Sequence, residues 1–307
     1  DGLVLNSDGS LNMDRSFVRI DYFALLHGIS VRNNVQRGIT NRPVDMIATR
    51  LPRELVLPLI EDKDIDEDVI WVAAAANRQA LLLSRRDAAG QLSLRYLPIS
   101  NLKQDANGRL QFQSISWQAD LPLRIYEDPN LNIPIADRTA WLTQWHTDQE
   151  WLEALHRTHY SNGLIGLHEE LARHRTERLS ADDPTLDEQT RLMRNYERRK
   201  RELVEPDMLI VAQDHWNFDV RGFNPGGNHG AFFRISTHSV FMVAGGRRTN
   251  IPRALDINKP YDSLSFVPTL LALTGDLHDD NNPVPTLRER GFHRFPGRVV
   301  KELLPEW

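Results

Sequence analysis

The sequence predicts an α/β protein with a mostly parallel central sheet flanked by helices, and with a β-meander in its N-terminal half. Two observations favour this fold. Short apolar runs bounded by turn-forming residues are typical of buried strands. From residue 137 onward, such runs alternate with stretches of helical periodicity, and this alternation is typical of parallel sheets. The whole chain, residues 1–307, is expected to form a single domain.

The β-meander is expected within residues 65–118. Asn77-Arg78 and Asp87–Gly90 are good turn material between its apolar runs. The predicted strands are Val69–Ala73, Ala80–Ser84, Leu92–Tyr96 and Leu110–Ile115. Residues 1–60 show no comparable pattern, and three prolines there predict loops and short pieces. These prolines are Pro43, Pro52 and Pro58.

Helices are expected over most of Asp137–Arg173. Thr147 and Glu150 fit a capping box, in which each side chain binds a backbone amide of the other residue. An apolar stripe at helical spacing follows. The stripe consists of Tyr160, Leu164, Leu167 and Leu171, and three tryptophans lie upstream of it, at Trp141, Trp145 and Trp151. Core packing is the favoured role of these tryptophans, and an aromatic wall for a nucleobase is the alternative.

Composition restricts the classes of function. The net charge of -5 and the pI near 6.1 give no reason to expect nucleic acid as a partner. No apolar run is long enough to predict a membrane span, and the expected compartment is the cytoplasm. The chain has no cysteine, so a metal site would have to use histidine, carboxylate and hydroxyl ligands. It does not begin with methionine, which suggests a fragment or a processed product. Oligomeric state is not predicted.

The stretch richest in chemistry starts at an apolar run, Met208–Ala212, which predicts a strand that leads into Asp214 and His215. In open α/β sheets, ligands lie just beyond the carboxyl ends of strands. A loop rich in glycine then carries His229, and a second predicted strand, Ser239–Ala244, follows. One carboxylate and two imidazoles therefore lie between two strands, and these groups are the usual ligands of zinc and neighbouring divalent metals.

This order of elements, followed by a helix that ends at Gly275, resembles the alkaline phosphatase superfamily over residues 206–275. The branch it resembles contains type I phosphodiesterases and nucleotide pyrophosphatases. The resemblance implies a two-metal site in which Asp214 and His215 bind one metal and His229 binds the other. Zinc fits these ligands best, and manganese is second. The implied activity is hydrolysis of a phosphoric ester, either a small molecule or a nucleotide.

Two parts of the superfamily pattern are not found in the sequence. The Asp-x-x-x-His ligand pair has no match, because Leu152 stands four residues after Asp148. His156 or His159, with Asp148 brought close by a turn, is a weaker candidate for the missing ligands. No serine or threonine in residues 1–60 fits the expected nucleophile, so no catalytic residue is assigned. The nucleophile-bearing segment has diverged or lies outside this chain.

Three interpretations follow from these matches and gaps. The first is a metal-dependent hydrolase of phosphoric esters. The alternative is a non-catalytic relative that acts as a binding or structural module. A sulfatase ranks third, because the absence of cysteine removes one route to its formylglycine nucleophile. His27, in a His-Gly-Ile run, is either a loop residue or a remnant of a phosphodiesterase motif.

Overall fold

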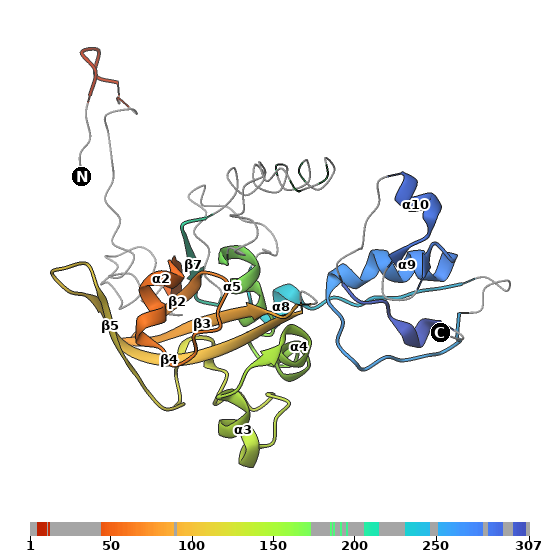
Figure 1. Cartoon of the computed structure of the whole chain (residues 1–307), viewed down its shortest axis with the longest axis horizontal. Helices are drawn as coiled ribbons and strands as arrows, with labels where there is room; N and C mark the ends of the chain where they lie inside the picture. Colours follow the sequence, from red (N-terminus) through yellow and green to blue (C-terminus); the bar gives the residue numbers. More distant parts are fainter. Residues whose placement is uncertain are drawn as a thin grey trace.

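The computed structural model describes most of the chain. The described residues are 5–10, 12, 44–88, 91–172, 206–214, 231–245, 251–278, 282–290 and 297–304, with single residues at 185, 187, 191 and 195. Figure 1 shows a twisted sheet with helices packed against it, and a second group of helices around α9 that is joined to the sheet region by an extended segment.

The elements follow one another along the chain as follows. The strands are β1 (Val44–Leu51), β2 (Val69–Ala74), β3 (Arg78–Arg86), β4 (Leu92–Gln104), β5 (Leu110–Ser114), β6 (His146–Thr147), β7 (Met208–Ala212), β8 (Leu277–His278) and β9 (Asn282–Pro283). The α-helices are α2 (Arg53–Val56), α3 (Ile135–Leu142), α4 (Asp148–Leu155), α5 (Gly163–Leu171), α8 (Arg234–Thr237), α9 (Phe266–Thr274) and α10 (Pro285–Glu289). The 3-10 helices are η1 (Leu57–Leu59), η2 (Pro122–Arg124), η3 (Ser263–Ser265) and η5 (Lys301–Leu303).

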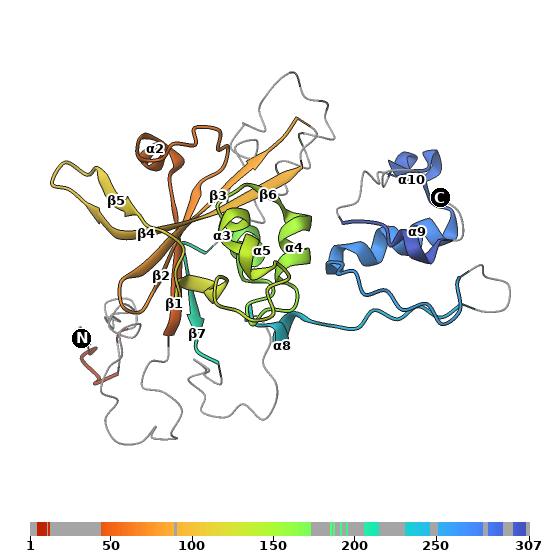
Figure 2. The ribbon, with the colours of Figure 1, turned by 90° about the horizontal axis from the view of Figure 1, so that it is seen from below.

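The main sheet has seven strands in the order β5-β4-β3-β2-β1-β7, with β6 paired to β4. Every pairing in this sheet is antiparallel, so the predicted mostly parallel sheet is wrong. The prediction relied on strand-helix alternation after residue 137 and on the resemblance to the alkaline phosphatase superfamily. Among the described residues of that part of the chain, only β6 and β7 join the main sheet, each beside a strand formed earlier in the chain. Figure 2 shows β7 beside β1 at the edge of the sheet.

The β-meander is confirmed, because β2, β3, β4 and β5 are consecutive antiparallel neighbours. The sequence did not predict β1. This strand lies between Pro43 and Pro52, which the sequence assigned to loops. Proline is tolerated at the ends of a strand, where its missing N–H breaks no central hydrogen bond. Between the two prolines, the side chains of Ile47 and Ala48 are fully buried.

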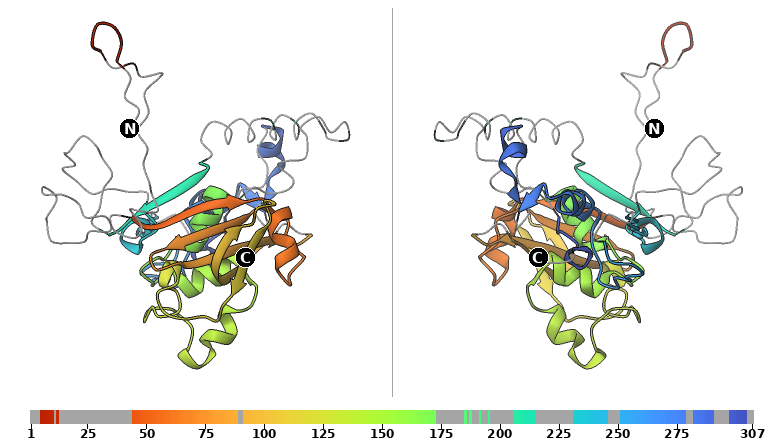
Figure 3. Two further views of the ribbon diagram at one scale, coloured as in Figure 1. Left: turned by 90° about the vertical axis from the view of Figure 1, so that its left-hand side faces the viewer. Right: turned by 90° about the vertical axis from the view of Figure 1, so that its right-hand side faces the viewer.

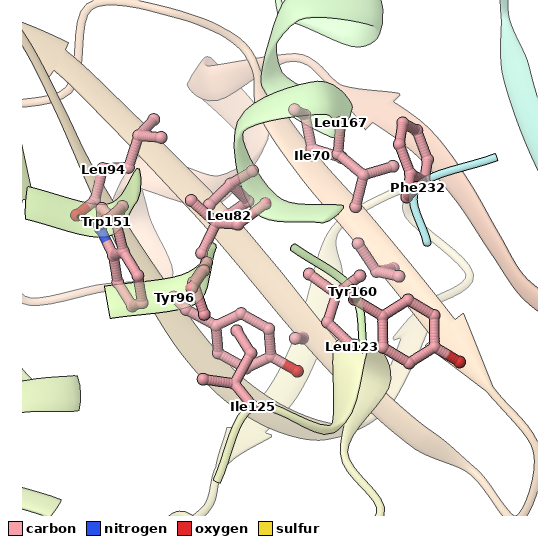
Figure 4. Close-up of a cluster of buried hydrophobic side chains, with 14 of the residues drawn as sticks. Ile70, Leu82, Leu94, Tyr96, Leu123, Ile125, Trp151, Tyr160, Leu167 and Phe232 are labelled. Atoms are coloured by element: carbon pink, nitrogen blue, oxygen red, sulfur yellow. Dashed lines mark hydrogen bonds between the residues drawn. The ribbon is translucent and has the colours of Figure 1, made fainter. Parts of the chain in front are cut away.

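The apolar core lies on both faces of the sheet, because side chains alternate between the faces along each strand. On one face, Ile70, Leu82 and Tyr96 pack against α4 and α5, as Figure 4 shows. The opposite face is covered by α2 and η1, where Val56 and Ile60 contact the sheet. The views in Figure 3 show α3 extending beyond the sheet on the side of α4.

The helical predictions in the middle of the chain are largely confirmed. Thr147 and Glu150 form the capping box at the start of α4. All four residues of the predicted stripe are buried against the sheet, although α5 itself begins only at Gly163. Trp151 is completely buried in the same core. Trp141 packs against this core, and Trp145 packs against the cluster on the other face of the sheet.

Helix α9 ends at the predicted position. The Asp262 side chain accepts a hydrogen bond from the Ser265 amide, and α9 then runs to Thr274 with Pro268 in its first turn. Gly275 follows with a φ of 80°. This left-handed conformation, which glycine adopts without a steric penalty, ends the helix.

The predicted strand at Ser239–Ala244 is wrong, because these residues form no strand in the structure. Val240 and Met242 are 82% and 85% exposed, in the extended segment that links α8 to the region of α9 in Figure 2. No helix among the described residues is long and apolar enough to cross a membrane.

Candidate functional site

A β-bulge places a carboxylate inside the protein at the start of β1. Val44 pairs with Ala212 of β7, yet Met46 pairs with the preceding residue, Val211, so Asp45 is the extra residue of the bulge. Val44 and Ile47 contribute to one apolar cluster, and Met46 contributes to the core on the opposite face. The bulge therefore turns Asp45 toward the same face as Met46, where α5 and η2 lie. Only 7% of Asp45 is exposed.

The buried carboxylate of Asp45 is held by two donors from distant parts of the chain. The Tyr160 hydroxyl, just before α5, donates a hydrogen bond to Oδ2 of Asp45. The Gln213 side-chain amide, just after β7, donates to Oδ1 over 2.8 Å. Burial and the negative charge of Asp45 raise the pKa of Tyr160 well above its ordinary value, so the hydroxyl remains a donor at neutral pH. These bonds connect β1, β7 and the segment before α5.

Asp214 lies at the same end of the sheet. It is the second residue after β7, it is partly buried, and it follows Gln213. Its negative charge is the smallest of the contributions that raise the pKa of Tyr160, after burial and Asp45. The residue before Asp214 thus binds a second carboxylate at this end of the sheet, and the sequence did not indicate that carboxylate.

A pocket of about 200 Å³ opens at this position. Asp45, Tyr160 and Gln213 line part of it, together with two arginines, a second aspartate and several apolar residues. Arg78 and Asp120 form an ion pair, with Nη1 and Oδ2 2.5 Å apart. Arg124 is exposed, and its guanidinium makes no hydrogen bond or ion pair with the residues that the structure describes. The pocket thus combines a buried anion with a cation that is accessible to solvent.

Several residues of the pocket wall have strained backbone conformations. Ala76, Asp120, Leu123 and Arg124 have φ values of 60°, 62°, 67° and 45°. A residue with a side chain costs about 1–2 kcal/mol in this region. The Tyr96 hydroxyl donates a 2.8 Å hydrogen bond to the Pro122 carbonyl oxygen and so fixes η2 against the sheet. Such strain persists only where surrounding contacts determine the conformation, and it is frequent at binding sites.

Gly163 allows the pocket wall to approach α5. A Cβ atom added there would lie 2.6 Å from Cδ2 of Leu123 and 3.1 Å from Cβ of Tyr160. We expect Gly163→Ala to lower the free energy of unfolding by about 1–2 kcal/mol, because overpacking outweighs the gain in helix propensity. Denaturant unfolding measures this change. Combining it with Leu123→Ala should give a favourable coupling energy, since the shorter side chain relieves the clash. Purely additive effects would contradict the proposed contact.

The structure separates the weaker predicted ligands. Asp148 begins α4, where its Oδ1 accepts a 2.8 Å hydrogen bond from Gln91, and His156 follows the last residue of that helix. A helix of this length places its ends about 12 Å apart, so Asp148 and His156 do not share a site. The ring of His159 instead packs against Tyr160 and Phe233. His215, His229 and His27 lie outside the described residues.

Sequence reasoning located Asp214 but missed Asp45, Tyr160, Gln213 and Arg124. Asp45 lies in an apolar run beside Pro43, and no sequence signal distinguishes a bulge there. Tyr160 belonged to the predicted apolar stripe, and its hydroxyl was a usable hint, because a buried tyrosine normally finds a hydrogen-bond partner.

Among the described residues, no group of three or more histidine, aspartate or glutamate side chains is arranged to hold a metal ion. Comparisons with protein-family models, with curated proteins and with solved structures found no match to this chain.

Proposed function

We propose that this chain forms the metal-binding part of a hydrolase of phosphoric esters, of the phosphodiesterase or nucleotide pyrophosphatase type. One observation carries the proposal: Asp214 follows the end of β7, directly after Gln213, which binds the buried Asp45 carboxylate and lines an open pocket. The proposal rests on this local arrangement and on the motif around Asp214. It does not rest on a parallel sheet.

The side chains proposed as ligands are of the kinds that bind divalent metals. Asp214 offers carboxylate oxygen, and His215 would offer an imidazole nitrogen directly beside it in the chain. Asp45, with its two hydrogen bonds, would orient neighbouring groups and add negative charge. Hydrogen-bonded carboxylates around a metal ligand commonly have this role. Zinc is the first choice and manganese the second, with His229 as a further proposed ligand.

The metal would supply Lewis acidity for an in-line displacement at phosphorus. Water adds to phosphorus, the P–O bond to the leaving alcohol breaks, and the alcohol departs with a proton. The residues of this chain would bind and orient the ester. The second candidate, a binding module that retains metal but does not turn over substrate, is favoured by the absence of an assigned nucleophile in the sequence.

Metal content tests the proposal directly. We expect the purified chain to hold about two equivalents of zinc or manganese by mass spectrometry, in keeping with a two-metal site. His215→Ala and His229→Ala should each lower this content, because each removes a proposed ligand. His238→Ala is the matched control, since His238 is an exposed histidine that the proposal does not use. Hydrolysis of bis(p-nitrophenyl) phosphate should disappear with chelation and return with added zinc.

Two other results would change the conclusion. Metal that is bound by the wild type and lost in both His215→Ala and His229→Ala, without any hydrolysis, would favour the binding module. A chain that binds no metal even after reconstitution would overturn the hydrolase.

A further inference from the structure

The segment that links α8 to the region of α9 has the composition of a strand but no strand beside it. Figure 2 shows it as an extended stretch of chain. None of residues 239–244 makes a backbone hydrogen bond with the part of the chain that the structure describes. These residues are apolar apart from one serine, and they include no charge and no proline. An exposed segment of this kind readily pairs with another strand.

Helix α9 is apolar on two faces, and only one of them is covered. Phe266–Thr274 contains no charged residue. One face of the helix packs on the small C-terminal core that contains Val299. On the other face, Phe266, Val267 and Leu270 are 48%, 46% and 39% exposed. A helix that is apolar all round is normally buried, so this second face is of the kind that a partner covers.

The open face of α9 and the linking segment form one surface, which we call the apolar patch. The rings of Phe241 and Phe266 join the two elements, with centroids 5.4 Å apart and an angle of 67° between the ring planes. The patch consists of Val240, Phe241, Met242, Leu264, Phe266, Val267 and Leu270. At their exposed fractions, and with about 150–200 Å² per large apolar residue, the patch offers roughly 600–800 Å² to a partner. Monomeric proteins rarely expose this much contiguous apolar surface.

Two properties of the patch favour a second copy of this chain as that partner. A stable interface buries about 800 Å² on each side, and the patch approaches this size. Across a two-fold axis, a charge near the axis would face its own copy, so such an interface favours uncharged residues. Residues 239–245 and 264–275 contain no charged residue. A different protein would be selected by complementary charges, and a membrane surface by lysine and arginine, which these residues also lack.

Antiparallel pairing of residues 239–244 about a two-fold axis accounts for both parts of the patch. The paired strands donate to and accept from each other the backbone hydrogen bonds that the single chain leaves to water. Because side chains alternate along a strand, Val240 and Met242 lie on one face and Phe241 lies on the other, toward Phe266 of α9. The helix α9 of each chain then lies on one face of the paired strands. On the other face, the valine and methionine side chains of the two chains pack together.

We propose that the apolar patch is the interface of a homodimer, in which residues 239–244 of the two chains pair as antiparallel strands. This inference goes beyond the proposed function and does not depend on it, because the patch contains none of the proposed metal ligands. A monomer that binds metal would reject the dimer alone, and a dimer that binds no metal would reject the hydrolase alone.

Sedimentation equilibrium of the full chain measures the association. We expect a species of twice the 35.3 kDa of one chain at a concentration of about 10 μM. Met242→Lys should raise the dissociation constant of the dimer at least about 10-fold, because it places two like charges near the axis. The matched control is Ile135→Lys, since Ile135 is 84% exposed, Met242 is 85% exposed, and Ile135 begins α3, outside the patch. This control should leave the dissociation constant unchanged.

Disulfide formation tests the antiparallel pairing, since the chain has no cysteine of its own. Facing residues in an antiparallel pair have Cα atoms about 4.5–5.5 Å apart, a separation that a disulfide spans. The residue on the axis faces its own copy. One of four single variants should therefore form a covalent dimer on mild oxidation, seen on a non-reducing gel. These variants are Val240→Cys, Phe241→Cys, Met242→Cys and Val243→Cys, and Ile135→Cys is the control that should stay monomeric on the gel.

Thermal unfolding establishes that the variants fold. Met242 is exposed in the single chain, so Met242→Lys should leave the unfolding of the monomer unchanged. Four results would overturn the inference: a chain that stays monomeric up to its solubility limit, assemblies larger than a dimer, an association that Met242→Lys does not weaken, or no covalent dimer from any of the four cysteine variants. A monomeric chain that binds phosphatidylcholine vesicles through Met242 would assign the patch to a membrane surface instead.

Discussion

Replacing Glu67 with glutamine is expected to lower the free energy of unfolding by about 3 kcal/mol at pH 7. The Glu67 side chain is 1% exposed and accepts three hydrogen bonds. Ser84 donates to Oε2 over 2.7 Å, Arg86 donates to Oε1 over 3.0 Å, and His168 of α5 donates from Nε2. Glutamine keeps the shape but cannot accept all three. At least one of these donors would then lose its hydrogen bond to residue 67.

The contribution of Glu67 can be measured from the pH dependence of the free energy of unfolding. Burial alone would raise the pKa of Glu67, but the hydrogen bond and charge of His168, with Ser84 and Arg86, lower it to about 2. Because the folded-state pKa is below the ordinary value of 4.5, the contribution is fully present above pH 4.5. It is lost progressively as pH falls toward 2. Denaturant unfolding of the wild type should therefore show this loss, and the Glu67→Gln variant should show less of it.

A surface pair supplies the control for Glu67. Glu54 contacts Arg53 over 3.2 Å, but its side chain is 59% exposed. Glu54→Gln should change stability by less than about 0.5 kcal/mol, since exposed ion pairs contribute little. Equal effects of Glu67→Gln and Glu54→Gln would show that the buried network does not stabilise the fold. The same conclusion would follow if the stability of Glu67→Gln declined below pH 4.5 as steeply as the stability of the wild type.

The sequence predicted the elements whose signals are local. The strands of the meander alternate with turn residues, the capping box at Thr147 specifies a helix start, and Gly275 specifies a helix stop. Strand direction is not a local property. The apolar run of β7 is compatible with either orientation, and only its pairing with β1, more than 150 residues earlier in the chain, makes it antiparallel.

In the candidate site, too, local signals were visible in the sequence and contacts between distant segments were not. Asp214 was predicted as a ligand because a strand end is visible in sequence, whereas the contacts around Asp45 join distant segments. Tyr160 and Gln213 meet at Asp45 across separations of 115 and 168 residues, and a bulge turns the carboxylate toward them. At Ser239–Ala244 the sequence predicted a strand that the structure does not form. Its composition favours a strand, but a strand also needs a neighbour, and no described segment pairs with it.

Burial decides whether Trp151 belongs to the apolar core or to a wall that stacks on a nucleobase. Trp151 has no exposed surface, and its indole Nε1 donates a 3.0 Å hydrogen bond to the Leu94 carbonyl oxygen. It also meets the Trp141 ring edge-on, with ring centroids 4.8 Å apart. A nucleobase cannot stack on a side chain enclosed in this way. Trp151 therefore belongs to the core, and its removal should mainly affect stability.

We expect Trp151→Ala to lower the free energy of unfolding by about 3–5 kcal/mol, because it removes a large buried ring and leaves a cavity between α4 and β4. Trp145 is the comparison. It is partly buried, with its indole bonded to Asp62 and the Arg85 guanidinium 4.4 Å above its ring. Trp145→Ala should cost less, about 1–2 kcal/mol, since the lost contacts are near solvent.

Denaturant unfolding compares the two tryptophan variants. If Trp151→Ala does not fold, Trp151→Phe retains most of the apolar volume and should lose about 1–2 kcal/mol with the hydrogen bond to Leu94. A Trp151→Ala chain as stable as the wild type would mean that α4 does not pack on β4 as described. Weakened adenosine monophosphate binding in a Trp151→Phe chain of wild-type stability would restore the nucleobase wall as the better interpretation.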